Sequence, residues 1–368
     1  MQDSEVKLFL SETLAGRYRP LRHVGSGGFA GVFEARDGHT GESVAAKILK
    51  LSQCSISASQ REFRDEVELL GKLRGCDRVI QLHDSGEHTV NLSHPLSGES
   101  ISVGTEFSVL ELAAGSLADL LLYGAEFSWP DRLRLYRDVV KGVHQMHLHR
   151  IVYRDVKAEN GLVFEGRWPV VKVGDLGRSH DTSEPPRFAI EAYLHGRGDT
   201  HFAPFEFLWL QGTQDPEDQA RADLFLLGAL LFEIATGVSY TALVTASPVT
   251  VIHEKAALAE RDRERDWREN VPLLREAARP ALETLRGALP ASIAARTVAL
   301  VRELTDPDPA RRLPARRRGR GEQPSAWSLE WLLERVGGLR RAVDPELRRR
   351  YVAERPRPQH GRPRSRAR

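Results

Sequence analysis

The sequence predicts an α+β protein of two lobes, in which a small β-rich lobe precedes a larger α-helical lobe. The first 110 residues read mostly as short β-like runs separated by glycine turns. From about residue 115 the apolar residues recur at three- and four-residue spacing, which is typical of helices. The chain has 368 residues and is 41% hydrophobic, so it is long enough for two packed lobes and too long for one small core.

The first lobe is predicted from brief strand-like runs and one helix. The early runs are Tyr18–Gly25, Val32–Ala35 and Ser43–Leu49. A helix is expected at about 60–74, where Phe63, Val67 and Leu70 recur at helical spacing. Strand-like runs return over residues 79–112 around a polar loop.

The second lobe is predicted from its helix signals. Ser128 precedes a helix with Pro130 in its first turn, and an apolar stripe follows to Met146. A strongly apolar helix is expected at about 221–236. Further helices are expected within 250–304 and 325–336.

These elements indicate one domain over residues 16–336, with a first lobe of about 16–113 and a second of about 114–336. Residues 1–15 form an N-terminal extension. Residues 339–368 form a basic tail with 11 Arg and 3 acidic residues, expected to be disordered or weakly helical. Such a tail is either a solvated end or a contact for an anionic partner: a nucleic acid, a lipid surface or the acidic domain itself.

The net charge of +2 hides a strong asymmetry along the chain. Residues 1–310 contain 35 Lys and Arg against 45 Asp and Glu, whereas residues 311–368 contain 18 against 6. An acidic body of net charge −10 therefore carries a basic end of net charge +12. Arginine greatly outnumbers lysine among the basic residues. A GC-rich genome explains this excess of arginine as well as any selected role does.

Composition excludes several classes of protein. Two cysteines cannot make a disulfide framework or a four-cysteine zinc site, which favours a reducing compartment. The longest apolar stretch, Leu224–Ile234, is too short to span a bilayer. The N-terminus has no basic region of the kind that opens a signal peptide. A cytoplasmic protein without a transmembrane segment is expected.

A glycine-rich turn, Gly25–Val32, lies between two strand-like runs. Glycines let such a loop bring its backbone N–H groups close to phosphate oxygens. Alone this signal is weak, because most glycine-rich turns are only turns.

Lys47 lies inside an apolar strand, where an unpaired charge is costly. The predicted helix at 60–74 offers Glu62, Glu66 and Glu68 as partners. Glu66 is the best of them because it lies beside the apolar face of the helix. The alternative is an edge-strand lysine that reaches water.

The strongest constellation is Tyr153–Asn160, followed twenty residues beyond Asp155 by Asp175 in an Asp-Leu-Gly turn. Asp155, Asn160 and Asp175 supply hard oxygens that suit Mg²⁺ and a base for a hydroxyl nucleophile. Lys157 adds a positive charge near a transferring phosphoryl group.

Taken together, these motifs resemble the eukaryotic-like (Hanks-type) serine/threonine protein kinases over about residues 16–336, which implies the bilobal protein kinase fold. The markers occur in the family's order: the glycine-rich loop, the Val-Ala-Ala-Lys47 lysine, the helix glutamate, Tyr153–Asn160, Asp175-Leu-Gly, Ala203-Pro-Phe-Glu206, the Asp223 helix and Arg312.

The resemblance implies ATP as substrate, bound with Mg²⁺ or alternatively Mn²⁺. It places around ATP the residues Gly25, Ser26, Gly27, Gly28, Val32, Ala45, Lys47, Leu110 as gatekeeper, Glu111, Ala113 and Asn160. Lys47 would hold the α- and β-phosphates and pair with Glu66, and Asn160 and Asp175 would coordinate the metal. Asp155 would accept the substrate proton, and Lys157 would steady the γ-phosphoryl group.

The resemblance also implies scaffold and regulatory roles. Glu206 and Arg312 would form a buried ion pair, and Asp223 would brace the catalytic loop. Lys157 favours Ser/Thr over Tyr specificity, and Arg154 beside the base suggests activation by a phosphate. The candidate phosphorylation sites, of which the sequence selects none, are Ser179, Thr182, Ser183 and Thr200.

This sequence departs from the family pattern at several places. Tyr153 replaces a histidine, Leu176 replaces a phenylalanine, and Phe205 is inserted before Glu206. Residues 187–200 do not align with the usual substrate-docking segment, so the sequence does not define the peptide-binding surface. An active protein kinase with autophosphorylation is expected. The alternatives are a nucleotide-binding pseudokinase or scaffold, and a small-molecule kinase on the same fold.

Overall fold

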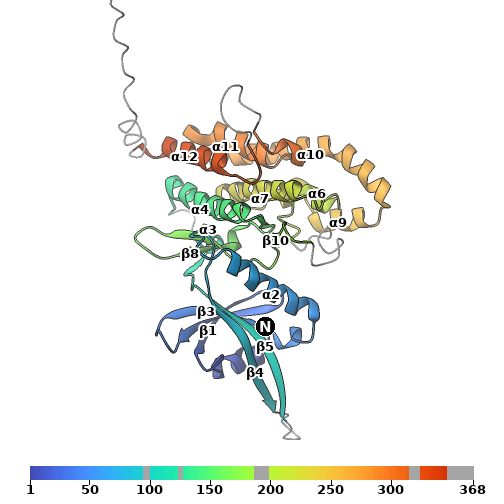
Figure 1. Cartoon of the computed structure of the whole chain (residues 1–368). Coiled ribbons are helices and arrows are strands. Elements are labelled where there is room, and N and C mark those ends of the chain that lie inside the picture. The colour runs from blue at the N-terminus through green and yellow to red at the C-terminus, as the bar shows by residue number, and fades with distance from the viewer. Residues whose placement is uncertain (94–99, 123–126, 186–198, 315–323, 346–368) are drawn as a thin grey trace, which may run out of the picture.

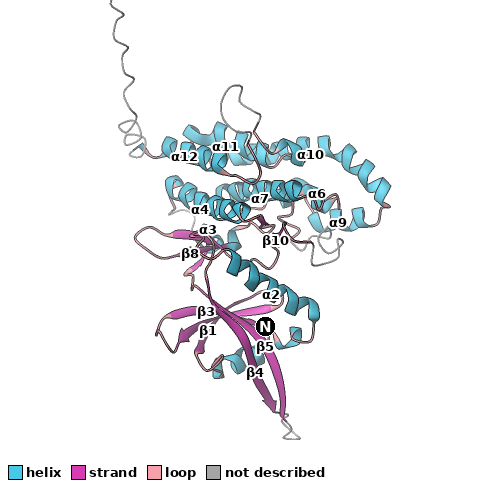
Figure 2. Cartoon of the chain, viewed as in Figure 1, coloured by secondary structure: helices cyan, strands magenta, loops and turns pink. Residues whose placement is uncertain are grey.

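The structure is a computed structural model that describes residues 1–93, 100–122, 127–185, 199–314 and 324–345. A twisted sheet forms one end of the molecule and a layered group of helices forms the other (Figures 1 and 2). Helix α2 (Ser57–Lys72) lies beside the sheet where the two regions meet. The expected α+β architecture of a small β-rich lobe and a larger helical lobe is therefore confirmed.

The first lobe is a five-stranded antiparallel sheet with the strand order β1-β2-β3-β5-β4. Its strands are β1 (Tyr18–Ser26), β2 (Ala30–Asp37), β3 (Ser43–Leu49), β4 (Leu82–Ser93) and β5 (Ser100–Leu110). Strand β3 lies inside the sheet, so Lys47 is not on an edge strand. The alternative of an edge-strand lysine that reaches water is therefore wrong.

An N-terminal helix, α1 (Asp3–Ser11), is an element that the sequence did not predict. Phe9 is its one buried residue, and its ring packs against Phe33 of β2 with the centroids 6.0 Å apart. Val6, Leu8 and Leu10 are only partly buried against the same cluster, so the apolar face of this short helix is weak.

Helix α2 begins three residues before the predicted start, and a short turn, η1 (Leu51–Gln53), leads into it. Its buried face carries Phe63, Leu69 and Leu70, as its apolar spacing predicts, and also Glu66. A buried carboxylate on this apolar face must find a cation or donors inside the protein.

The second lobe is organised around α4 (Trp129–Leu148) and α7 (Pro216–Thr236). Ser128 caps α4, because its side chain accepts a hydrogen bond from the Asp131 amide. Helix α7 is buried almost all round and ends at Gly237, whose φ of 75° is left-handed. The other helices are α3 (Leu117–Leu122), α6 (Phe205–Leu208), α8 (Tyr240–Thr245), α9 (Pro248–Ala256), α10 (Glu260–Ala288), α11 (Ala291–Leu304) and α12 (Glu330–Val343).

Helix α12 continues to Val343, seven residues beyond the predicted end, so residues 339–343 are helical. The rest of the basic tail, from residue 346, lies outside the described residues. Within the described ranges, no helix combines the length and the apolar character needed to cross a bilayer.

Short strands between the five-stranded sheet and the helices carry the two loops that form the candidate site (Figure 1). They are β6 (Gly115–Ser116), β7 (Ile151–Val152), β8 (Gly161–Phe164), β9 (Val170–Val173) and β10 (His180–Asp181), with two turns, η3 (Ala158–Asn160) and η4 (Pro309–Arg311). Residues 153–160 connect β7 to β8, and residues 174–179 connect β9 to β10. Because β8 pairs with β9 and β7 pairs with β10, both loops emerge side by side.

Candidate active site

The loop at 153–160 is held by the carboxylate of Asp223 on α7. The amides of Tyr153 and Arg154 each donate to it at 2.7 Å, and the ring of His147 binds it at 2.8 Å. Arg154 adopts a left-handed φ of 68°, which is strained for a side chain of its size. Asp223 is fully buried, and its two oxygens fix the amide of this strained residue and the amide of the residue before it.

Asp155 and Asn160 meet inside this loop. The Nδ2 of Asn160 donates to the Asp155 carbonyl at 2.9 Å and to its Oδ2 at 2.7 Å. Burial raises the pKa of Asp155, while the positive charges of Lys157 and Arg178 oppose that rise. The carboxylate is thus oriented by an amide and kept in a partly desolvated place, which is suitable for a base.

Two cations lie near the same oxygen of Asp155. Lys157 Nζ is 3.8 Å and Arg178 Nε is 3.6 Å from Asp155 Oδ2, both beyond direct hydrogen-bond length. Lys157 was predicted, but Arg178 was not. No spacing pattern marks an arginine in this position, because only the folding of two loops brings it to Asp155.

Lys47, Glu66 and Asp175 form a three-membered charge cluster. Lys47 Nζ lies 2.6 Å from Glu66 Oε2 and 3.1 Å from Asp175 Oδ1. Burial alone would lower the pKa of Lys47, but the charges of Asp175 and Glu66 outweigh it and raise that pKa. Glu66 also accepts a hydrogen bond from the Leu176 amide at 3.2 Å, so it contacts both Lys47 and the backbone directly after Asp175.

Asp175 is the exposed member of that cluster. The charge of Lys47 is the main reason that the pKa of Asp175 is lowered, and the carboxyl is therefore ionised at neutral pH. Its side chain is 54% exposed, in contrast to the 5% of Glu66. An ionised and exposed carboxylate can take a further cation.

The glycine-rich turn covers this cluster from the sheet side. Lys50 Nζ donates to the carbonyls of Gly27 and Gly28 at 2.6 and 2.9 Å, and fixes the turn. The ring of Phe29 lies 5.5 Å from Lys47 Nζ, within cation–π range. A Cβ added at Gly25, Gly27 or Gly28 would meet no atom within 4 Å, so these backbones border open space.

The predicted adenine-binding residues lie at the end of β5. Leu110 pairs in register with Ala45 of β3, and Val32 pairs with Lys47, so the four share one stretch of the sheet. The Glu111 amide donates to the Gln81 carbonyl at 3.2 Å, and the Glu111 carboxylate binds Lys172 at 2.5 Å.

These contacts at Glu111 leave its carbonyl, rather than its amide, for a ligand. Ala113 follows between the two lobes. Ser26 Oγ accepts from the N-terminal amine of Met1 at 3.3 Å.

The donor set fits a magnesium ion bound with a nucleotide. Asn160 uses its Nδ2 on Asp155, which leaves its amide oxygen as a ligand atom beside the carboxylate of Asp175. No group of three or more His, Cys, Asp and Glu side chains is placed to hold a metal ion within the described ranges. Mg²⁺ is commonly held by one or two protein oxygens together with substrate phosphates, so two protein ligands are sufficient.

Three hydroxyls of the segment after β9 donate hydrogen bonds to neighbouring residues. Ser179 Oγ donates to the Tyr153 carbonyl at 3.3 Å, Thr182 Oγ1 to the Arg150 carbonyl at 2.9 Å, and Ser183 Oγ to Asp181 at 2.5 Å. Thr200 is the second residue of the next described stretch, 199–314. Residues 187–198 of the poorly aligned segment lie outside the described residues.

Glu206 and Arg312 make the expected buried pair. Arg312 donates through Nη1 and Nη2 to the two oxygens of Glu206 at 2.7 and 2.6 Å. The additional Phe205 does not disturb it, because Phe205 begins α6 and packs against Phe225 with the ring centroids 5.1 Å apart.

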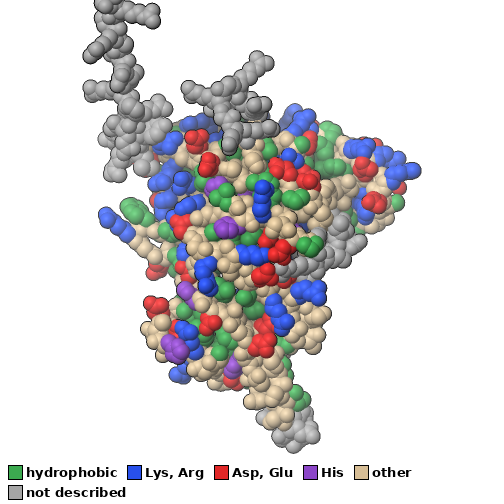
Figure 3. All heavy atoms as spheres, viewed as in Figure 1, with side chains coloured by type: hydrophobic (Ala, Val, Ile, Leu, Met, Phe, Trp, Pro, Cys, Tyr) green, Lys and Arg blue, Asp and Glu red, His purple; other side chains and the backbone are tan. Residues whose placement is uncertain are grey.

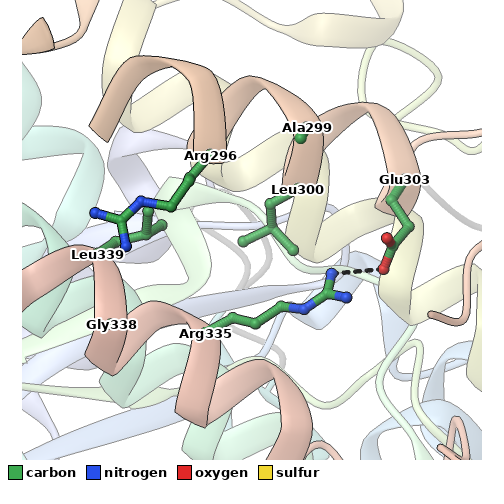
Figure 4. A pocket seen from close by; sticks show the side chains of 7 residues that line it. All are labelled: Arg296, Ala299, Leu300, Glu303, Arg335, Gly338 and Leu339. Carbon is green, nitrogen blue, oxygen red and sulfur yellow. Dashed lines mark hydrogen bonds and ion pairs between the residues drawn. The ribbon is translucent and has the colours of Figure 1, made fainter. Parts of the chain in front are cut away.

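Away from this site, a pocket lies within the helical lobe. A pocket of about 350 Å³ lies between α11 and α12, and the Arg335–Glu303 ion pair of 2.7 Å spans it (Figure 4). Figure 3 shows acidic and basic side chains interspersed over the viewed face of the helical lobe. The acidic excess of residues 1–310 therefore forms no single patch on that face.

Comparison with known proteins gives one family. The model of that family, described as "Protein kinase domain", matches residues 18–318. The chain is 31% identical over 259 residues to a probable serine/threonine-protein kinase of Clostridium perfringens, a match that covers 67% of this chain and 33% of that protein. It is 24% identical over 231 residues to the serine/threonine-protein kinase PrkC of Bacillus subtilis, covering 62% of this chain and 32% of PrkC.

A probable serine/threonine-protein kinase of Streptomyces coelicolor is 27% identical over 243 residues, covering 66% of this chain and 33% of that protein. The matched region thus spans about a third of the length of these relatives.

Proposed function

The chain belongs to the protein kinase domain family, and on that premise we propose that it is an active serine/threonine kinase. It transfers the γ-phosphoryl group of ATP to a Ser or Thr hydroxyl of a protein. The observation that carries this proposal is the meeting of Asp155, Asn160, Asp175 and the paired Lys47 at one site. A chain that had lost phosphoryl transfer would have no reason to keep all four.

In this proposal, residues of the sheet lobe bind the nucleotide. Lys47, fixed by Glu66, binds the α- and β-phosphates, and the amides of Gly25–Gly28 approach the phosphates from above. Leu110, Ala45 and Val32 enclose the adenine, whose edge meets the backbone of Glu111 and Ala113. These are the residues around ATP that we propose, together with Ser26.

Asn160 and Asp175 hold the metal ion, which when bound neutralises charge on the phosphate oxygens. Asp155 Oδ accepts the proton of the substrate hydroxyl as the new O–P bond forms and the bond from the γ-phosphorus to the bridging oxygen breaks. Lys157 steadies the transferring group, and ADP leaves. Positioning and charge supply most of the acceleration, because the transition state of phosphoryl transfer is loose.

We propose that Ser or Thr is the acceptor and that the chain autophosphorylates in the segment after β9. Support comes from Lys157 in the loop and from the Ser and Thr hydroxyls close to it. Phosphosite mapping after incubation with Mg-ATP identifies the acceptor residue type. Phosphotyrosine alone would contradict the specificity.

The base assignment is tested with Asp155→Asn, which keeps the shape of the side chain and its hydrogen bond to Asn160. We expect phosphate incorporation to fall by about 10²–10⁴-fold, the usual contribution of a positioned base. Binding of Mg-ATP, measured as a shift of the melting temperature, is expected to persist. The control is Asp262→Asn, a partly exposed residue in the first turn of α10, and this variant should label as wild type does.

Three results would redirect the proposal. Labelling of Asp155→Asn at the wild-type level would remove Asp155 as the base. A wild-type protein that binds Mg-ATP without transferring phosphate is a pseudokinase. Transfer to small molecules of a lysate, seen by mass spectrometry, with no protein labelled, would indicate a small-molecule kinase.

A further inference from the structure

Arg178 is a cleft residue that neither the family motifs nor the mechanism above uses. It follows the Asp175-Leu-Gly177 turn, and its Nε lies 3.6 Å from Asp155 Oδ2. Its Nη1 is buried and has no hydrogen-bond acceptor in the part of the chain that the structure describes. The side chain as a whole is 36% exposed, so it lies at the border between protein and cleft.

A buried guanidinium nitrogen without an acceptor is costly, since it has lost water and gained no partner. Native proteins rarely leave such an atom unless a ligand, an ion or water completes it. The available carboxylate does not satisfy the group, because Asp155 Oδ2 lies 3.6 Å from Nε, beyond hydrogen-bond length. Arg178 is therefore close to the base without being saturated by it.

The charge of Arg178 acts on both carboxylates of the cleft. It lowers the pKa of Asp155 and of Asp175 and so favours the ionised forms of the proposed base and the proposed metal ligand. In the proposed reaction, the γ-phosphoryl group passes from ATP to a hydroxyl near these two carboxylates, and it carries three anionic oxygens. A planar guanidinium with an open donor is the side chain best suited to bind phosphoryl oxygens.

We propose that Arg178 is a further catalytic residue, whose partly exposed guanidinium donates to an oxygen of the γ-phosphoryl group of ATP. It complements Lys157, which lies 3.8 Å from the same Asp155 oxygen. This inference rests on the proposed function. It assigns to Arg178 a contact that ATP makes and ADP, which lacks the γ-phosphoryl group, does not.

The experiment compares two nucleotides by calorimetry in the presence of Mg²⁺: ADP and a non-hydrolysable ATP analogue. For Arg178→Gln we expect affinity for the ATP analogue to fall about tenfold, the loss of one charge-assisted hydrogen bond. Affinity for ADP should stay within about twofold of wild type. Arg178→Lys, which keeps the charge, should recover part of the lost affinity.

The matched control is Arg340→Gln on α12, on the side of the helical lobe away from the sheet (Figure 1). Arg340 also has a buried guanidinium nitrogen without an acceptor. Its replacement should leave both affinities unchanged.

Equal losses for ADP and the ATP analogue would overturn the inference, because the arginine would then only shape the cleft. An Arg178→Gln variant that keeps the wild-type preference for the triphosphate, or transfers phosphate faster than wild type, would also overturn it. In the second case the arginine restrains Asp155 instead of serving transfer. Wild-type protein that binds neither nucleotide would refute the proposed function and this inference together.

Discussion

Two groups of charged side chains in the helical lobe differ in how closely their members are hydrogen-bonded to one another. Arg312 and Glu206 are almost fully buried, and their two bonds of 2.6 and 2.7 Å are supplemented by a 2.9 Å bond from Arg312 to the Asp306 carbonyl. In the cleft, Lys157 and Arg178 stay 3.6–3.8 Å from Asp155, and Asp175 is half exposed.

The difference separates stability from function. A buried pair with every donor used resists change, because removal of one member leaves the other charged and desolvated. A cleft in which donors and oxygens are left open contributes less to stability, but it retains contacts that a ligand can complete. Between these two groups, the saturation of hydrogen bonds separates the scaffold pair from the charges around Asp155.

The largest effect on stability is expected at the scaffold pair. Arg312→Met leaves Glu206 buried without its cation, so we expect the free energy of unfolding to fall by about 3–5 kcal/mol. Urea denaturation measures it. The double variant with Glu206→Gln should lose less than the sum of the two single losses. Additive losses would mean that the two side chains do not act as a pair.

Glu233 on α7 should give stability a pH dependence. Burial raises its pKa to about 7, although the Ala158 amide donates to it at 3.3 Å. The unfolded carboxyl titrates near about 4.3, so between there and pH 7 the unfolded state releases a proton that the native state keeps. This contribution is therefore fully present below about pH 4.3 and is lost as the pH rises to about 7.

Unfolding free energies measured across that range test the assignment of Glu233. Glu233→Gln should flatten the decline, whereas Glu254→Gln on exposed α9 should leave it unchanged. A decline that persists in Glu233→Gln would have to come from another group.

The smallest effect is expected at Lys72, which links α2 to the segment after β9. Lys72 Nζ binds Asp181 at 2.8 Å and also contacts Glu184. Lys72→Met should cost at most about 1 kcal/mol, since the lysine is partly exposed, and should lower transfer several-fold by loosening that segment.

Lys141→Met is a matched control for Lys72, because Lys141 has an equal exposure of 35% against 34% and a 2.8 Å bond to Asp77. It should cost similar stability without a loss of transfer. Charge reversal at both ends, Lys72→Glu with Asp181→Lys, should restore part of the activity. Identical behaviour of the two lysine variants would show that the link is structural only.

Local residues were enough to predict much of the fold. Ser128 caps α4 because a cap acts on the amides directly after it, and β3 has the predicted bounds because its apolar run is uninterrupted. Glu66 could be chosen among three glutamates because helical spacing places it beside the apolar face. Helix α1 was not predicted, since Phe9 is its one fully buried residue and its other apolar residues are only partly buried.

The sequence by itself determined the order of the motifs, the lobes and the pairing of Lys47 with Glu66, because each rests on residue type and short-range spacing. Only the tertiary structure placed Arg178 beside Asp155, Phe29 above Lys47, and Lys50 beneath the glycine-rich turn. Those contacts join separate strands and loops, whose relative positions are set by the packing of the sheet against the helical lobe. No local pattern encodes such distances, so the contact that extends the proposed mechanism became visible only in three dimensions.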